Sequence, residues 1–332
     1  MPTSLQGIAK KAASQKGSRF RNLYRMLDED LLTQCWQDIR KDAASGVDQV
    51  SAQQYEQHLE EHIHHLVERL KQKRYRAKLV RRHYIPTGDG TQRPLGIPAV
   101  EDKLLQLAVA RLLEAIYEQD FLRCSYGYRP HVGALEAVDT LTIKLQFGRY
   151  AWVVEADIKT FFDTIDHDWM VRMLAERIDD GALLRLIRKW LKAGVLDTDG
   201  TVLHPVTRTP QGGTASPILA NVFLHYVLDL WFEKVVKQHC RGEACLIRYA
   251  DDCARSKHRQ MQNDSTMCWG NDWRNSDWSC RRPRRGSSRS VGTDSQDKPA
   301  SSFSGLSFAG ARIARGKITS SAEPPARNSA MP

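Results

Sequence analysis

The chain has 332 residues, of which 41% are hydrophobic and 27% charged, and its formal net charge is +10. No apolar run approaches the ~18 residues needed to span a bilayer, the N-terminal residues lack the apolar core of a secretory signal, and the seven cysteines have no paired C-x-x-C spacing that would favour a zinc site or a disulfide scaffold. We therefore expect a cytoplasmic protein with no membrane partner and room for one large domain or two ordinary ones.

The positive charge is concentrated in two parts of the chain. Residues 253–332 hold 14 Lys and Arg against six Asp and Glu, so most of the net charge lies there. A second basic run, from Arg69 to Arg82, contains no acid and has Tyr75 in its middle. Because a solvated helix face normally mixes acids with bases, we favour a phosphate-binding surface over a solvated face for this run.

The spacing of apolar residues predicts the elements in chain order. Residues 20–75 are typical of helices, with apolar positions three and four residues apart and a turn at Gly46-Val47-Asp48. A strand at Leu79–Ile85 ends at the turn residues Pro86–Gly90, and the extended segment Arg93–Pro98 follows it as a hairpin partner. Further helices are predicted at Asp102–Gln119, Trp169–Arg177, Ala182–Ala193 and Pro217–Leu230.

Two of the predicted strands carry acids at their ends. The strand Trp152–Ala156 runs into Asp157, and the strand Cys245–Arg248 runs into Tyr249-Ala250-Asp251-Asp252. Adjacent carboxylates repel one another, so such a pair persists where a cation or water compensates for the charge. Acids at the ends of two strands indicate a site for divalent metals, and two metals suit phosphoryl transfer.

The composition changes abruptly after Asp252. Residues 253–332 hold fifteen serines but only four Ile, Leu or Val, and Arg281–Gly286 is a basic run interrupted by a proline. Such a segment cannot bury enough apolar surface to offset the entropy of ordering it. We expect residues 253–332 to be a low-complexity, basic and disordered tail.

Six sequence blocks, in this order, resemble a reverse transcriptase, and more narrowly the bacterial group II intron-encoded type. The resemblance covers roughly residues 20–252. The blocks are Gly46-Val47-Asp48, Arg93–Pro98, Ser125–Pro130, Ala156–Asp163 with Ile165-Asp166-His167, Pro210-Gln211-Gly212 with Ser216-Pro217, and Tyr249–Asp252.

This resemblance implies an α+β fold with the fingers and palm of a right-hand polymerase, in which helices support an antiparallel palm sheet. We assign residues 1–60 to an N-terminal helical extension and residues 61–252 to the reverse transcriptase fingers and palm, with the thumb missing.

The resemblance also implies a metal site. Asp157 and Asp251 would ligate two Mg²⁺ ions, for which Mn²⁺ can substitute, with the backbone carbonyl of Ile158 as a further ligand. Asp252 would be a supporting carboxylate.

Three more residues match positions that meet the nucleotide in this family. Phe162 matches a steric gate beneath the sugar, Gln211 a residue that contacts the incoming nucleotide, and Arg93 the fingers residue that meets the triphosphate. Without the family match, an ordinary core aromatic would be the better interpretation of Phe162. For Tyr128-Arg129-Pro130, a template contact and packing are equally favoured.

The implied function is that of an RNA-directed DNA polymerase, a nucleotidyltransferase that adds dNTPs to a DNA primer on an RNA template, here intron RNA. Two alternatives stay open: a non-catalytic remnant that binds intron RNA through Arg69–Arg82, and a retron-type or defence-type reverse transcriptase. The Gly46–Asp48 and Arg93–Pro98 blocks favour the intron type.

The resemblance fails after Asp252, where the aliphatic second strand of the family's hairpin is replaced by Cys253–His258. The Lys-containing segment, the thumb and the maturase region of the family do not follow. Our hypothesis is that residues 253–332 are translated out of frame, which the other two reading frames of the coding DNA would reveal. We accordingly expect Tyr249–Asp252 to lie in an unpaired edge strand and polymerase activity to be weak or absent.

Overall fold

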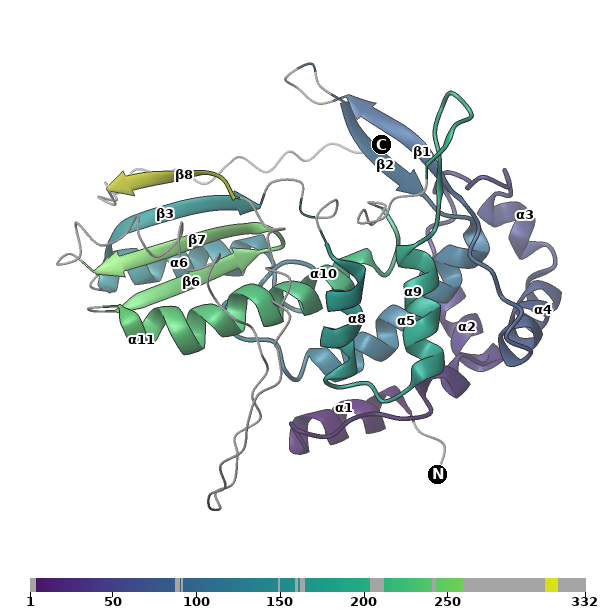
Figure 1. Cartoon of the computed structure of the whole chain (residues 1–332), viewed down its shortest axis with the longest axis horizontal. Coiled ribbons are helices and arrows are strands. Elements are labelled where there is room, and N and C mark those ends of the chain that lie inside the picture. The colour runs from purple at the N-terminus through teal and green to yellow at the C-terminus, as the bar shows by residue number, and fades with distance from the viewer. Residues whose placement is uncertain are drawn as a thin grey trace, which may run out of the picture.

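The computed structural model describes residues 4–86, 90, 92–148, 150–158, 161, 165–203, 212–240, 243–258 and 308–315, with the backbone alone at 151–152, 154–157, 253–258 and 308–315. It has helices and two four-stranded sheets, so the predicted α+β class is confirmed. The helical part and the second sheet lie toward opposite ends of the long axis in Figure 1. None of the helices that the structure describes is long and apolar enough to cross a bilayer.

The N-terminal helices begin at side-chain caps. Ser4 accepts a hydrogen bond from the Gly7 amide, Asp28 accepts one from the Leu31 amide, and Ser51 forms a capping box with Gln54. The pattern over 20–75 did not extend to the first of these helices. They are α1 (Leu5–Ser14), the 3₁₀ turn η1 (Leu23–Met26), α2 (Glu29–Trp36), α3 (Ala52–Glu56) and α4 (Leu59–Lys71).

Helix α5 (Val100–Tyr117) is the centre of the core. One face of this helix, predicted at Asp102–Gln119, is fully buried, and α1, α2 and α10 (Ser216–Leu224) pack against the helix. The apolar residues of that face are Leu104, Leu105, Ala108, Leu112 and Ile116. The positions beside this face are buried as well, because Val109 and Leu113 are inaccessible to solvent. Helices α8 (His167–Ala175) and α9 (Gly181–Leu191) belong to the same apolar cluster. The helices that precede residue 60 therefore share one core with those that follow it.

The first sheet is built on a long hairpin, as predicted. Strand β1 (Val80–Pro86) pairs antiparallel with β2 (Gln92–Ile97), and the pair stands away from the helices in Figure 1. Two short strands complete the sheet in the order β2-β1-β4-β5. They are β4 (Val195–Leu196), parallel to β1, and β5 (Val202–Leu203).

The second sheet has the order β6-β7-β3-β8 and is wholly antiparallel between neighbours. Helix α6 (Ala134–Phe147), which the apolar pattern did not predict, packs against β6 and β3. Helix α10 continues into two π-helical turns, η2 (His225–Asp229) and η3 (Phe232–Val236), and then into α11 (Lys237–His239). The strands are β3 (Tyr150–Ile158), β6 (Ala244–Tyr249), β7 (Asp252–His258) and β8 (Phe308–Arg315).

Strand β7 corrects an expectation from the sequence. We expected Tyr249–Asp252 to lack a partner strand and residues 253–332 to be disordered, but residues 252–258 pair with β6 on one side and with β3 on the other. Ladder hydrogen bonds use backbone groups that any residue except proline supplies, so a polar sequence placed between two strands can complete both ladders. Residues 308–315 are also a strand, paired with the free side of β3. The rest of the expected tail lies outside the described residues.

Candidate active site

The acids predicted from the sequence gather at one end of the second sheet. Asp252 is the first residue of β7 and the Cα partner of Asp157 in β3, and Asp251 lies in the two-residue turn between β6 and β7. Asp252 is exposed and Asp251 is half-buried. Ile158 follows Asp157, is 3% exposed and belongs to the apolar core cluster.

This donor set fits a hard divalent cation. Opposite residues of an antiparallel pair have Cα atoms about 4.5–5.5 Å apart, close enough for one ion to accept a donor from each strand. Carboxylate and carbonyl oxygens are the donors that Mg²⁺ prefers, and it usually takes few of them from the protein and others from substrate phosphates. Among the side chains that the structure describes, which exclude that of Asp157, no three acids, histidines or cysteines form a metal cluster by themselves.

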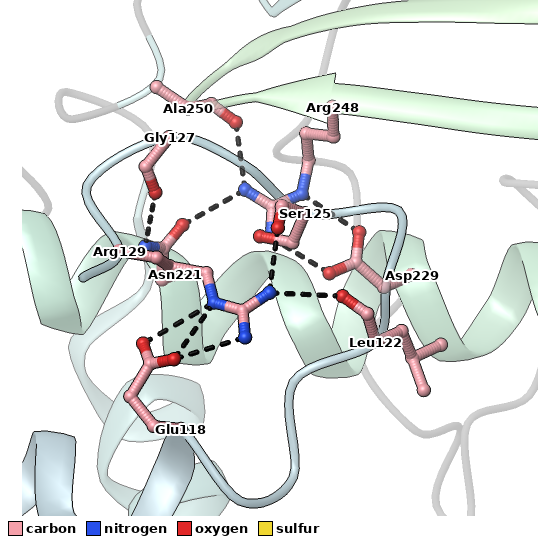
Figure 2. Close-up of polar contacts among 9 residues, drawn as sticks. All are labelled: Glu118, Leu122, Ser125, Gly127, Arg129, Asn221, Asp229, Arg248 and Ala250. Atoms are coloured by element: carbon pink, nitrogen blue, oxygen red, sulfur yellow. Dashed lines mark hydrogen bonds and ion pairs between the residues drawn. The ribbon is translucent and has the colours of Figure 1, made fainter. Parts of the chain in front are cut away.

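The turn that carries Asp251 lies above a buried arginine. Arg248 is 0% exposed, and its guanidinium donates through Nε and Nη2 to the two carboxylate oxygens of Asp229 at 2.8 Å each. It also donates to the Ala250 carbonyl at 2.9 Å, the Asn221 Oδ1 at 3.0 Å and the Ser125 Oγ at 2.6 Å. Figure 2 shows these partners converging on the guanidinium from below and beside the β6–β7 turn.

The segment 124–130 packs against the same turn. A Cβ atom on Gly127 would come within 2.2 Å of the Ala250 amide nitrogen, so only a residue without a side chain fits there. The Asn221 amide donates to the Gly127 carbonyl at 2.8 Å, and the Tyr126 hydroxyl donates to Thr140 at 3.0 Å. The turn is therefore held by Arg248 on its carbonyl side and by Gly127 on its amide side.

A template contact and packing were equally favoured for Tyr128-Arg129-Pro130, and in the structure Tyr128 and Arg129 differ. The Arg129 guanidinium pairs with Glu118 at 3.0 Å and donates to the carbonyls of Leu122 and Ser125, which is packing (Figure 2). Tyr128 is 54% exposed and has a φ of 55°, a left-handed conformation that is uncommon for a residue with a side chain.

The nucleotide-contacting residues predicted from the sequence are described only in part. Arg93 is exposed on β2, where its Cα partner in β1 is Ile85. Gly212, with a φ of 107°, lies so close to β2 that a Cβ atom would come within 2.3 Å of the Gly96 carbonyl oxygen. Gly212 thus lies against the hairpin that carries Arg93. Phe162 and Gln211 lie outside the described residues.

The basic run Arg69–Arg82 has acidic partners that its own sequence does not contain. Arg69 pairs with Glu101 of α5, and Lys78 pairs with Asp48 at 2.8 Å. The Arg81 guanidinium donates to the Ser45 carbonyl at 2.6 Å. Part of the run therefore joins elements of the protein to one another, and the exposed residues left for a phosphate surface include Lys73, Arg74 and Arg76.

A second buried polar cluster, which the sequence analysis did not single out, involves Asp102 of α5. The carboxylate accepts hydrogen bonds from the Tyr75 hydroxyl at 2.6 Å and the Lys78 amide at 3.0 Å. Burial raises the pKa of Asp102 to about 6, and the Tyr75 and Lys78 hydrogen bonds act in the opposite direction. Trp190 of α9 donates in turn to the Tyr75 hydroxyl at 2.8 Å, so the cluster joins the start of the hairpin to two helices.

Comparison with known proteins identifies relatives over most of this region. A family model described as "Reverse transcriptase (RNA-dependent DNA polymerase)" matches residues 85–263, which include every predicted site residue and extend past Asp252. The group II intron-encoded protein LtrA of Lactococcus lactis subsp. cremoris is 37% identical over 232 residues, which are 68% of this chain and 38% of that protein. The protein YkfC of Escherichia coli (strain K12) is 36% identical over 183 residues, 54% of this chain and 48% of its own.

The other similarities are more distant. The putative COX1/OXI3 intron 1 protein of Saccharomyces cerevisiae is 32% identical over 170 residues, 51% of this chain and 20% of that protein. Among solved structures, a chain of a partial Cas6-RT-Cas1–Cas2 complex aligns with 71% of this chain and 38% of its own, at 23% identity and a TM-score of 0.42. The chain thus spans less than half the length of each of these relatives.

Proposed function

Because the chain belongs to the reverse transcriptase (RNA-dependent DNA polymerase) family, of the group II intron-encoded type, we propose that the acids at the β6–β7 turn support nucleotidyl transfer. The reaction joins a dNTP to the 3′-hydroxyl of a DNA primer on an RNA template and releases pyrophosphate. The observation that carries the proposal is the register of the second sheet, which pairs Asp157 with Asp252 and leaves Asp251 in the adjoining turn. Residues almost a hundred positions apart in sequence thus meet at one end of the sheet.

The chemistry requires oxygen donors for two Mg²⁺ ions. Asp157, Asp251 and the Ile158 carbonyl would hold them, with Asp252 in support and with Mn²⁺ as a substitute. When bound, these ions lower the pKa of the primer hydroxyl and offset the negative charge of the triphosphate. The exposed position of Asp252 and the half-buried one of Asp251 leave the turn open to substrate.

Other residues would bind and orient the nucleotide. Arg93, exposed on β2, is placed to donate charge-assisted hydrogen bonds to the triphosphate. The contact between Gly212 and Gly96 supports a nucleotide role for Gln211, because Gly212, the next residue in the sequence, lies against the hairpin that carries Arg93. We keep Phe162 as the proposed steric gate that excludes a 2′-hydroxyl.

Tyr128 is the proposed nucleic-acid contact within its sequence block. Its ring is more than half exposed, it directly follows the glycine that packs against the catalytic turn, and its neighbour Arg129 is occupied by packing. Aromatic rings at such positions stack on bases or sugars without reading sequence. The left-handed backbone of Tyr128 is the kind of strain that is retained where function requires it.

Intron RNA is the proposed template and partner. The support is the names of the relatives, which include an intron-encoded protein of a bacterium and a putative intron protein of yeast. This also favours the intron type over the retron or defence type. The expectation of weak or absent activity rested on an unpaired Asp strand and on a missing thumb, and β7 removes the first of these reasons. We therefore propose incorporation of at least one nucleotide.

Alanine at Asp157 distinguishes this proposal from a non-catalytic RNA-binding remnant. The variant should lose incorporation of a single dNTP on a primed RNA template, while its affinity for the same RNA, measured by filter binding at fixed salt, stays within twofold of the wild type. Tight RNA binding by a folded wild-type protein that incorporates nothing would instead favour the binding remnant.

A further inference from the structure

We infer that Arg248 is a positioning residue that fixes the backbone of the β6–β7 turn, and with it the direction in which Asp251 and Asp252 are presented. The inference deepens the proposed function and rests on it for its catalytic consequence. Arg248 touches neither nucleotide nor metal in this scheme. Arg248 acts through the carbonyl of Ala250. Ala250 lies between Tyr249 and the acids Asp251 and Asp252 in the sequence.

Every N–H group of the guanidinium has its own acceptor. An arginine side chain offers five N–H donors in a rigid fork. Here they go to both oxygens of Asp229, to Asn221, to Ser125 and to Ala250, all between 2.6 and 3.0 Å (Figure 2). Asp229 and Arg248 are both 0% exposed. A buried charge is costly unless it is paired and its remaining donors are satisfied, and this complete set meets that requirement.

The acceptors come from three separate segments of the chain, since α10 continues into η2. Asn221 lies on α10, Asp229 on the π-helical turn η2, Ser125 in the segment before α6, and Ala250 in the turn itself. The Arg248 backbone joins the same segment, because its amide donates to the Cys124 carbonyl at 2.7 Å and its carbonyl accepts from the Tyr126 amide at 2.8 Å. Movement of the turn relative to α10 would therefore break several of these bonds together.

The turn needs such a restraint. Only Ala250 and Asp251 connect β6 to β7, and Ala250 has a φ of 55°, in the left-handed region that residues with a side chain rarely adopt. The Arg248 guanidinium donates to the Ala250 carbonyl, and Gly127 packs against the Ala250 amide. These two contacts stabilise the backbone conformation of Ala250, which determines the position of Asp251 and Asp252.

The π-helical turn is consistent with this arrangement. A π turn contains more residues than an α-helical turn and so changes which face the following side chains occupy, and such turns are frequent at functional sites. The turn η2 ends at Asp229, the counter-charge of Arg248. We include Asp229 in the positioning unit as the group that neutralises the guanidinium.

The test separates positioning from stability. Replacing both members of a buried ion pair by apolar residues is often neutral for folding, so the double variant Arg248→Met with Asp229→Leu is compared with wild type. The matched control is Arg177→Met with Asp120→Leu, which removes another largely buried pair, at 3.2 Å, that binds carbonyls of the N-terminal region and not the turn.

Three experiments are made on folded protein. They give the kcat and the KM for a single dNTP, the half-saturating Mn²⁺ concentration with primed RNA, and the amide hydrogen exchange in peptides that contain residues 249–252. We expect the double variant to lose kcat about 10–100-fold, the range found when groups that orient metal ligands are removed, with a KM for the dNTP within threefold of wild type. Its Mn²⁺ requirement should rise and its turn amides should exchange faster, while the control variant matches wild type in all three.

A folded double variant with wild-type kcat, Mn²⁺ requirement and turn exchange would overturn the inference. If the wild-type protein itself incorporates nothing, the proposed function fails, yet the exchange measurement still decides this inference: faster turn exchange supports it and unchanged exchange overturns it. If the double variant does not fold, Arg248→Lys takes its place, because an ammonium keeps the charge but cannot reproduce the fork. The same pattern is expected, and wild-type behaviour of that variant would overturn the inference.

Discussion

Replacing Gly127 by alanine tests whether the segment 124–130 and the β6–β7 turn form one packed unit. The new Cβ atom would lie 2.2 Å from the Ala250 amide nitrogen and 3.0 Å from the Ala250 Cα, both of them backbone atoms that cannot rotate away. Carbon atoms normally approach no closer than about 3.5 Å, so the two segments must separate by more than about 1 Å.

The cost has two parts. Overpacking of this kind costs about 1–3 kcal/mol, and the separation also weakens the bond from Arg248 to the Ala250 carbonyl, which as a bond from a charged donor contributes about 1.5–3 kcal/mol. The sum is about 2.5–6 kcal/mol, or a fall of roughly 5–24 °C in Tm at about 2–4 °C for each kcal/mol. Because the strain falls on the turn, incorporation of a dNTP measured at a temperature where the variant is still folded should fall as well.

Gly17 provides the matched control, since a Cβ atom there has nothing within 4 Å. Gly17→Ala should change the free energy of unfolding by less than about 1 kcal/mol. Both variants are compared by urea unfolding followed by circular dichroism, and by single-nucleotide incorporation. A Gly127→Ala protein within about 0.5 kcal/mol of wild type, the range of an ordinary surface change, and with wild-type incorporation would refute the reasoning.

Three other predictions use different parts of the molecule. Burial raises the pKa of Asp102 to about 6, above its unfolded value. The folded state therefore binds more protons between pH 4 and 6, and the free energy of unfolding falls as pH rises through that window. Asp102→Asn should remove up to roughly 3 kcal/mol of that fall, measured by urea titrations at several pH values, and an unchanged pH profile would contradict this prediction. Arg93→Ala should raise the KM for the dNTP about tenfold or more, as expected for loss of a charged hydrogen bond, whereas an altered kcat with the same KM would exclude a binding role. Tyr128→Ala should raise the KM for primed RNA about 5–100-fold, as for loss of stacking, with Tyr128→Phe close to wild type; equal kinetics in the alanine variant would remove Tyr128 from the nucleic-acid surface.

The sequence predicted the helices and strands whose formation depends on their own residues and on the adjoining turns. The β1–β2 hairpin follows from its turn residues, and α5 follows from an apolar face that is buried as expected. The strands that end in Asp157 and at Tyr249 were also predicted, and the structure brings their acids together through pairing with β7.

The features that the sequence did not predict depend on contacts with residues far away in the chain. The strand character of residues 252–258 comes from the open ladders of β3 and β6, and nothing in the composition of that segment indicates it. The family match also extends past Asp252, to residue 263. Out-of-frame translation of residues 253–332 stays a proposal for the coding DNA to test.

The burial and the ion pairs of charged residues also depend on distant parts of the chain. Arg248 reads as the basic end of an apolar strand, and its full burial depends on Ser125, Asn221 and Asp229, none of them a neighbour in sequence. The acid-free run Arg69–Arg82 likewise meets its acids, Glu101 among them, only in the folded chain. Helix α6 was missed because its apolar residues do not mark one buried face: Leu135 and Phe147 are 78% and 82% exposed.

The central claim, that the β6–β7 turn supports nucleotidyl transfer, is tested most directly by primer extension on an RNA template with Mg²⁺ and dNTPs. Wild type is compared with Asp251→Ala and with Asp42→Ala, whose acid is exposed and pairs with Arg40 far along the chain from the turn. We predict incorporation by wild type and by Asp42→Ala, and none above background by Asp251→Ala. Equal extension by Asp251→Ala, or no extension by a folded wild-type protein, would contradict the claim.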